Sequence, residues 1–152
     1  PKIFLGADHA GFKLKESVKK FLIESKFEVE DVGADKFEAD DDYPKFISIA
    51  AKKVSQTQNS KGIIFGGSGQ GEAMAANKAK GIRAAAYYGK NLDIVRLSRE
   101  HNDANILSLG ARFLEEKQAI EAVKLWLATP FSNEERHKRR IKQITQIEKT
   151  CK

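Results

Sequence analysis

A glycine-rich stretch from Gly66 to Glu72 has the residue types expected of a small anion-binding turn with a carboxylate beside it. It follows the apolar residues 63–65, reads Gly-Gly-Ser-Gly-Gln-Gly-Glu, and continues into helix-compatible residues from Ala73 onward. This pattern predicts a buried strand, a tight turn and the start of a helix. Such a turn directs several backbone N–H groups at one point, and a helix N-terminus adds partial positive charge. We therefore expect it to hold an anion that is either bound or formed during a reaction.

The spacing of these glycines does not fit the two common nucleotide-binding motifs. A dinucleotide fingerprint would need its third glycine at Glu72, and a phosphate-binding loop would need Lys-Ser or Lys-Thr where the chain has Glu72-Ala73. What remains is proton abstraction next to a carbonyl, which needs a base and N–H donors for the developing enediolate oxygen. On the residues alone a simpler role stays open, in which Glu72 only favours the helix dipole by ~0.3–1 kcal/mol.

Histidines and arginines supply further candidate groups. His9 and His101 each follow an acidic residue, and we expect both at the rim of the sheet where ligands bind, in proton transfer or phosphate binding. No metal site is predicted, because the histidines lack a short repeated ligand spacing. Arg136 and Arg140 are four residues apart, so they share one helix face and could bind a single phosphate. A solvated basic helix is the alternative.

Five apolar segments alternate with helical segments and would position these groups. The alternation predicts an α/β fold, a three-layer α/β/α sandwich around a five-stranded parallel sheet (Rossmann-like) with a C-terminal helix. Residues 1–152 are predicted to form a single domain, without an internal repeat or linker. Strands are expected at 2–6, 27–32, 63–65, 82–87 and 104–109, and helices at 12–25, 44–55, from 73, 91–99, 115–128 and 132–148.

Composition limits the class of protein. With 152 residues and 41% hydrophobic content, the chain can bury a core without a disulfide or metal. A net charge of +6 favours a polyanion or a phosphorylated small molecule as partner, without choosing between them. No apolar stretch approaches the ~20 residues of a membrane span, and no N-terminal leader is recognisable, so we expect no membrane association or export. The single cysteine, Cys151, suits a reducing cytoplasm.

The candidate groups lie in motifs that keep a fixed order along almost the whole chain. These are Gly-Ala-Asp8-His9-Ala-Gly11, Asp42-Tyr43-Pro44, Gly67-Ser68-Gly69-Gln70-Gly71-Glu72 with Asn77-Lys78, Gly81-Ile-Arg83, Arg99-Glu-His101-Asn102-Asp103, Leu-Gly110-Ala-Arg112 and Arg136-His137-Lys-Arg-Arg140. Together they resemble the type B ribose-5-phosphate isomerases, in the family that includes galactose-6-phosphate isomerase subunits.

One departure from the family pattern concerns the catalytic base. Many members carry a cysteine as base where this chain has Gly66. A second subgroup resembles this chain in Gly-Gly-Ser-Gly-x-Gly-Glu, and there the glutamate at the Glu72 position acts as base. The acidic residues 40–42 before Tyr43 also resemble that subgroup, and Cys151 in the tail does not replace the missing cysteine.

The resemblance implies a role for each candidate residue. Glu72 would abstract and return the proton between C1 and C2, and His101 would open the sugar ring. The amides around Gly67, Ser68, Gly69 and Gly71 would stabilise the enediolate, Asp8 and Asn102 would hold hydroxyls, and His9, Arg112, Arg136 and Arg140 would surround the phosphate. Family members are homodimers with shared active sites, in which His101 and Asn102 cross over. The chain is therefore expected to be inactive as a monomer.

The sequence thus predicts an aldose–ketose isomerase that interconverts ribose 5-phosphate and ribulose 5-phosphate without metal or cofactor. A 6-phosphohexose isomerase, acting on allose or galactose 6-phosphate, is the alternative enzyme. A non-catalytic sugar-phosphate-binding protein and a nucleic-acid-binding domain are the alternatives from other classes. Of these partners we expect the phosphorylated pentose and not nucleic acid.

Overall fold

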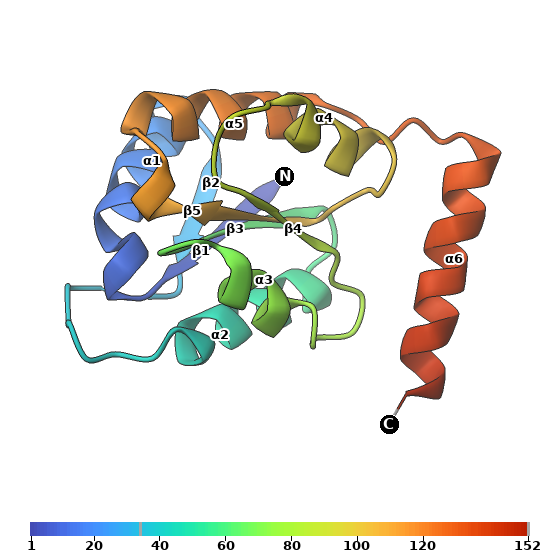
Figure 1. Ribbon diagram of the computed structural model, residues 1–152, viewed down its shortest axis with the longest axis horizontal. Helices are drawn as coiled ribbons and strands as arrows, with labels where there is room; N and C mark the ends of the chain where they lie inside the picture. The colour runs from blue at the N-terminus through green and yellow to red at the C-terminus, as the bar shows by residue number, and fades with distance from the viewer. Residues whose placement is uncertain (34, 152) are drawn as a thin grey trace.

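The chain folds around one parallel sheet with helices on both faces (Figure 1). The structure is a computed structural model and describes residues 1–33 and 35–151. Its strands are β1 (Lys2–Ala7), β2 (Glu28–Asp31), β3 (Ser60–Gly66), β4 (Ala84–Tyr87) and β5 (Ile106–Gly110). Their order across the sheet is β2-β1-β3-β5-β4, and every neighbouring pair is parallel. The predicted α/β sandwich with a five-stranded parallel sheet is confirmed.

The three central strands are buried on both faces, which explains their continuous apolar sequences. Nearly every residue of β1, β3 and β5, from Ile3 in β1 to Gly110 at the end of β5, is buried. The edge strands β2 and β4 are mostly half-buried. Strand β3 begins three residues before the apolar run that predicted it, because Ser60 to Gly62 also pair with β1.

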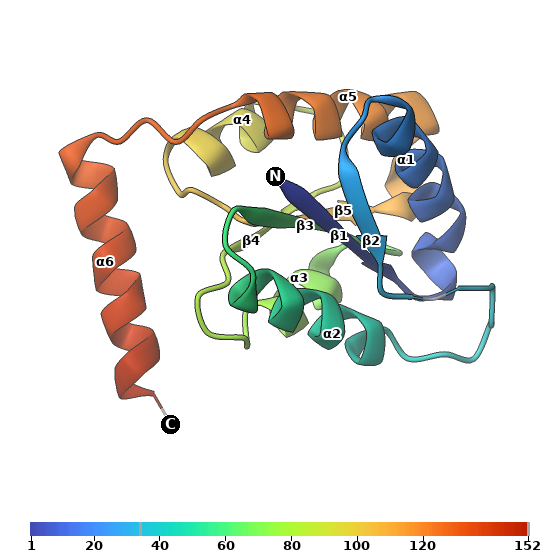
Figure 2. The ribbon, with the colours of Figure 1, turned by 180° about the vertical axis from the view of Figure 1, so that it is seen from behind.

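Two layers of helices cover the sheet (Figures 1 and 2). On one face, α1 (Phe12–Glu24), α4 (Asp93–Glu100) and α5 (Glu116–Ala128) pack around Phe65 and Trp126. On the other face, α2 (Tyr43–Gln56) and α3 (Gln70–Ala76) pack around Ile47 and Ile64. None of the helices in the described residues combines the length and apolar character that a membrane crossing requires.

The last helix, α6 (Glu135–Thr150), stands apart from this sandwich (Figure 2). It begins three residues later than predicted from the position of Ser132, because Asn133 adopts the left-handed backbone conformation, with φ of 61°, and cannot continue a helix. Near its C-terminal end, the carboxylate of Glu148 accepts a hydrogen bond from the backbone N–H of Gly81 at 2.9 Å.

The order of the strands creates a crevice at the carboxyl edge of the sheet. From β1 the chain passes through α1 to β2 on one side, whereas from β3 it passes through α3 to β4 on the other side. Ligands of open α/β sheets bind at such a switch point. Two short 3-10 helices, η1 (His9–Gly11) and η2 (Ala111–Phe113), follow β1 and β5 at the same edge.

Candidate functional site

The glycine turn after β3 is fixed to the end of β5 by two hydrogen bonds. The Ser108 hydroxyl donates to the carbonyl of Gly69 at 2.7 Å, and the backbone N–H of Arg112 donates to the carbonyl of Gly67 at 3.0 Å. Gly69 has φ of 79°, which places it in the left-handed region and ends the turn at the start of α3. The predicted strand, turn and following helix are therefore confirmed, and α3 begins at Gln70, three residues before the predicted start.

The carboxyl group of Glu72 lies directly against Gly66. Glu72 is in the first turn of α3 and only 5% exposed. A Cβ atom placed on Gly66 would lie 1.9 Å from Glu72 Cδ, so only glycine at position 66 leaves room for this carboxyl. The carboxyl of Glu72 thus occupies the space that a side chain at position 66 would fill.

The surroundings of Glu72 raise its pKa above the ordinary value of a glutamate. Burial is the largest cause, and the neighbouring carboxylate of Asp8 acts in the same direction. The backbone N–H groups of Glu72 itself and of Gly69 oppose the shift, as does the positive charge of Arg112. A carboxylate with a raised pKa is the better proton acceptor at neutral pH.

Asp8 and Arg112 complete the group around Glu72. Asp8 is buried at the end of β1 and accepts a hydrogen bond from the backbone N–H of Ala10 at 3.0 Å. The guanidinium group of Arg112 lies over Gly67, where an added Cβ would be 3.0 Å from Nη1. The crevice therefore brings together the predicted Asp8, Glu72 and Arg112 with the glycine turn.

His9 joins this group through a residue of the loop before α2. Its Nδ1 lies 2.8 Å from Oδ1 of Asp41, and this hydrogen bond is the largest cause of a raised pKa of His9. Possible ligand atoms of Asp8, His9 and Asp41 lie within 4.8 Å of one another, a grouping among the described residues that could hold a metal ion. The contact between His9 and Asp41 is instead a direct hydrogen bond.

Two residues at this site were not among the predicted site residues. Asp41 contacts His9. The hydroxyl of Tyr43 lies so close to Gly71 that a Cβ atom placed on Gly71 would be 2.6 Å from the hydroxyl oxygen. Both belong to the acidic and aromatic run before Pro44, whose aromatic side chain could face a ligand. This run is the sequence feature that could have identified Asp41 and Tyr43 as site residues, because capping the N-terminus of a helix does not require several acidic residues beside an aromatic one.

Four of the predicted residues lie at the opposite edge of the sheet. His101 and Asn102 follow α4 and precede β5, and the carbonyl of Asn102 accepts a hydrogen bond from Nε of Arg83, just before β4. The prediction that His101 shares the ligand-binding rim with His9 is therefore wrong within one chain. The five residues of β5 alone separate the two edges by roughly 16 Å.

The start of α6 packs beside His101. The rings of His101 and His137 are stacked, with centroids 4.2 Å apart and an interplanar angle of 18°. Burial lowers the pKa of His137, and the neighbouring side chains of His101, Arg136 and Arg140 act in the same direction. Arg136 and Arg140 are exposed, one turn apart, on the same helix. We call His101, Asn102, Arg136 and Arg140 the amino-edge group.

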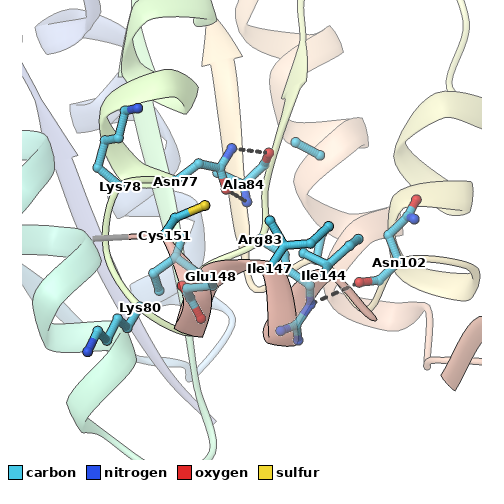
Figure 3. Close-up of a pocket in the computed structure, with 13 residues that line it drawn as sticks. Asn77, Lys78, Lys80, Arg83, Ala84, Asn102, Ile144, Ile147, Glu148 and Cys151 are labelled. Carbon is cyan, nitrogen blue, oxygen red and sulfur yellow. Dashed lines mark hydrogen bonds between the residues drawn. The ribbon is translucent and has the colours of Figure 1, made fainter. Parts of the chain in front are cut away.

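A pocket of about 890 Å³ lies between α6 and the amino edge of the sheet (Figure 3). Figure 3 shows Ile144 and Ile147 of α6 near Arg83, whose side chain reaches Asn102. No residue of the glycine turn lines this pocket. This pocket is thus separate from Glu72.

Comparisons with known proteins agree on one family. Residues 3–144 match the family described as Ribose/Galactose Isomerase. Ribose-5-phosphate isomerase B of Mycolicibacterium paratuberculosis is 40% identical over 149 residues, covering 98% of this chain and 92% of the relative. The structure of ribose-5-phosphate isomerase B from Mycoplasma genitalium with bound ribulose-5-phosphate matches with a TM-score of 0.93 and 37% identity, over 99% of this chain and 97% of that chain. The enzyme from Clostridium thermocellum matches with a TM-score of 0.92 and 41% identity, over 98% of each chain.

Proposed function

The chain belongs to the ribose/galactose isomerase family, and we propose that it interconverts ribose 5-phosphate and ribulose 5-phosphate with Glu72 as the catalytic base. The observation that carries the assignment of the base is the buried carboxyl of Glu72, which has a raised pKa and lies at the glycine turn in the space beside Gly66. The substrate pair is supported by the relatives of similar length and fold, one of them with ribulose-5-phosphate bound.

In the proposed reaction Glu72 removes the proton from C2 of the open-chain aldose. The electron pair of that C–H bond forms the C1–C2 double bond, and negative charge develops on O1. The N–H groups around Gly67, Ser68, Gly69 and Gly71 would stabilise this enediolate oxygen. Glu72 then returns the proton to C1, while a proton moves from O2 to O1, so that the carbonyl passes from C1 to C2. Asp8 holds a hydroxyl of the sugar in the same crevice.

The rest of the site comes from a second copy of the chain in this proposal. His9 and Arg112 at the carboxyl edge would meet the phosphate together with Arg136 and Arg140 of the amino-edge group, and His101 and Asn102 would act on the sugar ring. One chain holds the two groups at opposite edges of its sheet. A two-fold dimer can place the amino-edge group of one protomer at the crevice of its partner. We therefore propose a homodimer with two shared sites, in the cytoplasm.

A 6-phosphohexose isomerase is the second candidate, because the description of the matching family includes galactose. The test is to measure kcat/KM for ribose 5-phosphate, allose 6-phosphate and galactose 6-phosphate side by side. We expect a value for ribose 5-phosphate in the usual enzymatic range, about 10⁴–10⁸ M⁻¹s⁻¹, and at least tenfold lower values for both hexoses. A higher value for a hexose would reassign the substrate, and binding of all three without turnover would indicate a sugar-phosphate-binding protein.

A further inference from the structure

The loop between β2 and α2 holds His9 through a single oxygen atom. Oδ1 of Asp41 accepts a hydrogen bond from the backbone N–H of His9 at 2.9 Å and lies 2.8 Å from Nδ1 of the His9 ring. One atom thus bridges the backbone and the ring of the same residue, which fixes the side-chain torsions of His9. Phe37, from the same loop, contacts the ring edge-on with centroids 6.1 Å apart.

We propose that Asp41 is a positioning residue that sets the orientation and the protonation of His9 for the phosphate of the substrate. This inference rests on the proposed function and deepens it, because it adds a residue that does not itself touch the sugar phosphate. With Nδ1–H donated to Asp41, Nε2 is the ring nitrogen left to donate to a phosphate oxygen. Rotation of the ring would break the bond to Asp41, so the direction of Nε2 is fixed before the substrate arrives.

The charges around His9 favour its protonated form. Oδ1 of Asp41 is the closest acidic atom, and Oδ2 of Asp8 lies 4.0 Å from Nδ1, whereas Arg112 acts in the opposite direction. The balance raises the pKa of His9, and the hydrogen bond to Asp41 is the largest cause. A protonated ring donates a charge-assisted hydrogen bond to phosphate, which is stronger than a neutral one.

The remaining oxygen of Asp41 argues against a purely structural role. The Asp41 side chain is only 7% exposed, and its Oδ2 is buried without a hydrogen-bond partner among the described residues. A buried carboxylate oxygen without a partner reduces folding stability. A neutral amide or hydroxyl could make a purely structural contact at lower cost, so the negative charge itself is the feature that the arrangement preserves.

The first test follows the titration of the His9 ring by NMR, in protein labelled with ¹⁵N-histidine and with the signal assigned through His9→Gln. In Asp41→Ala and Asp41→Asn the midpoint should fall by at least half a pH unit relative to wild type, because both lose the negative charge. Asp40→Asn, which removes an exposed charge from the same loop, is the control and should leave the midpoint unchanged. An unchanged midpoint in Asp41→Ala, with the fold intact by circular dichroism, would overturn the proposal.

The second test separates substrate binding from chemistry. Asp41→Ala should raise KM for ribose 5-phosphate by about tenfold and leave kcat within about threefold, as expected when a ground-state contact is weakened. Asp41→Asn, which keeps an acceptor for both N–H groups, should approach wild-type KM at pH 6 and diverge from it as the pH rises through the lowered pKa of His9. Equal losses in both variants at every pH, or a loss confined to kcat, would contradict the proposal. If wild type fails to isomerise ribose 5-phosphate, the proposed function fails, whereas the NMR result still decides the link between Asp41 and His9.

Discussion

A single methyl group at position 66 would collide with the carboxyl of Glu72. The Cβ of an alanine at this position would lie 1.9 Å from Cδ and 2.1 Å from Oε2 of Glu72. Gly66→Ala should therefore displace the proposed base without changing its chemistry, and we expect kcat to fall by about 10²–10³. Steady-state kinetics of the single and double variants measures this effect. In the Glu72→Gln background Gly66→Ala should cause little further loss, and a full second loss would mean that Gly66 acts independently of Glu72.

The raised pKa of Glu72 predicts how activity depends on pH. A base works only when deprotonated, so kcat/KM should fall as the pH drops through the pKa of the free enzyme. Because burial raises the pKa of Glu72 above its ordinary value of 4.5, this acidic limb should lie above pH 4.5. The pH–rate profile, together with ¹³C NMR titration of the Glu72 carboxyl, measures it. A carboxyl that titrates at or below 4.5 would contradict the assigned environment.

The same shift predicts that the base lowers stability at neutral pH. A carboxyl whose pKa is higher in the folded than in the unfolded state binds its proton more tightly when folded, so stability is lost as the pH rises through these values. Glu72→Gln removes the charge and should stabilise the protein at pH 7–8 by about 1 kcal/mol, with a smaller gain near pH 4. Chemical denaturation at the two pH values measures the difference. If Glu72→Gln is less stable than wild type at pH 8, the buried charge of Glu72 does not destabilise the fold and the prediction is wrong.

Among the elements, the strands and the helices of the sandwich were predictable, because their apolar periodicity reports directly on burial. The glycine turn was predictable too, since Gly69 and Glu72 act within one local segment. The sequence predicts His101 at the wrong edge because its neighbours in sequence do not show that α4 returns the chain to the amino edge before β5. The contacts of Asp41 and Tyr43 depend on the path of the chain before Pro44. The C-terminal helix is predicted from the sequence and is present as α6, but its docking position depends on where its exposed apolar face is covered. Neither is encoded in local periodicity.

A buried ion pair joins α1 to the edge strand β2. Nζ of Lys15, which is fully buried, lies 2.5 Å from Oδ2 of Asp31, and the half-exposed Lys19 lies 3.1 Å from the same atom. Lys15→Ala would leave the Asp31 carboxylate largely buried with weaker compensation. We expect a loss of about 3 kcal/mol in the free energy of unfolding, against less than about 1 kcal/mol for Lys19→Ala. Urea unfolding of both variants measures these losses, and equal values would show that the two lysines are interchangeable.

For the whole molecule, the separation of the two groups at opposite edges predicts complementation between inactive variants. Glu72→Gln damages the crevice, and the double variant Arg136→Ala/Arg140→Ala damages the amino-edge group. In an equal mixture that exchanges subunits at random, half the dimers are mixed, and each mixed dimer carries one intact and one doubly damaged site. Activity should therefore recover to about a quarter of wild type. Failure to recover despite subunit exchange, shown by mass spectrometry, would mean that each site is built from one chain.

The replacement of Glu72 by glutamine tests the central claim most directly. Glutamine keeps the size of the side chain and removes the proton acceptor, so kcat for ribose 5-phosphate should fall by about 10³ or more while KM changes only a few-fold. In D₂O, wild type should incorporate solvent deuterium at C1 of ribulose 5-phosphate or C2 of ribose 5-phosphate, as followed by NMR, and Glu72→Gln should not. Turnover within a few-fold of wild type, with deuterium incorporation retained, would show that Glu72 is not the base.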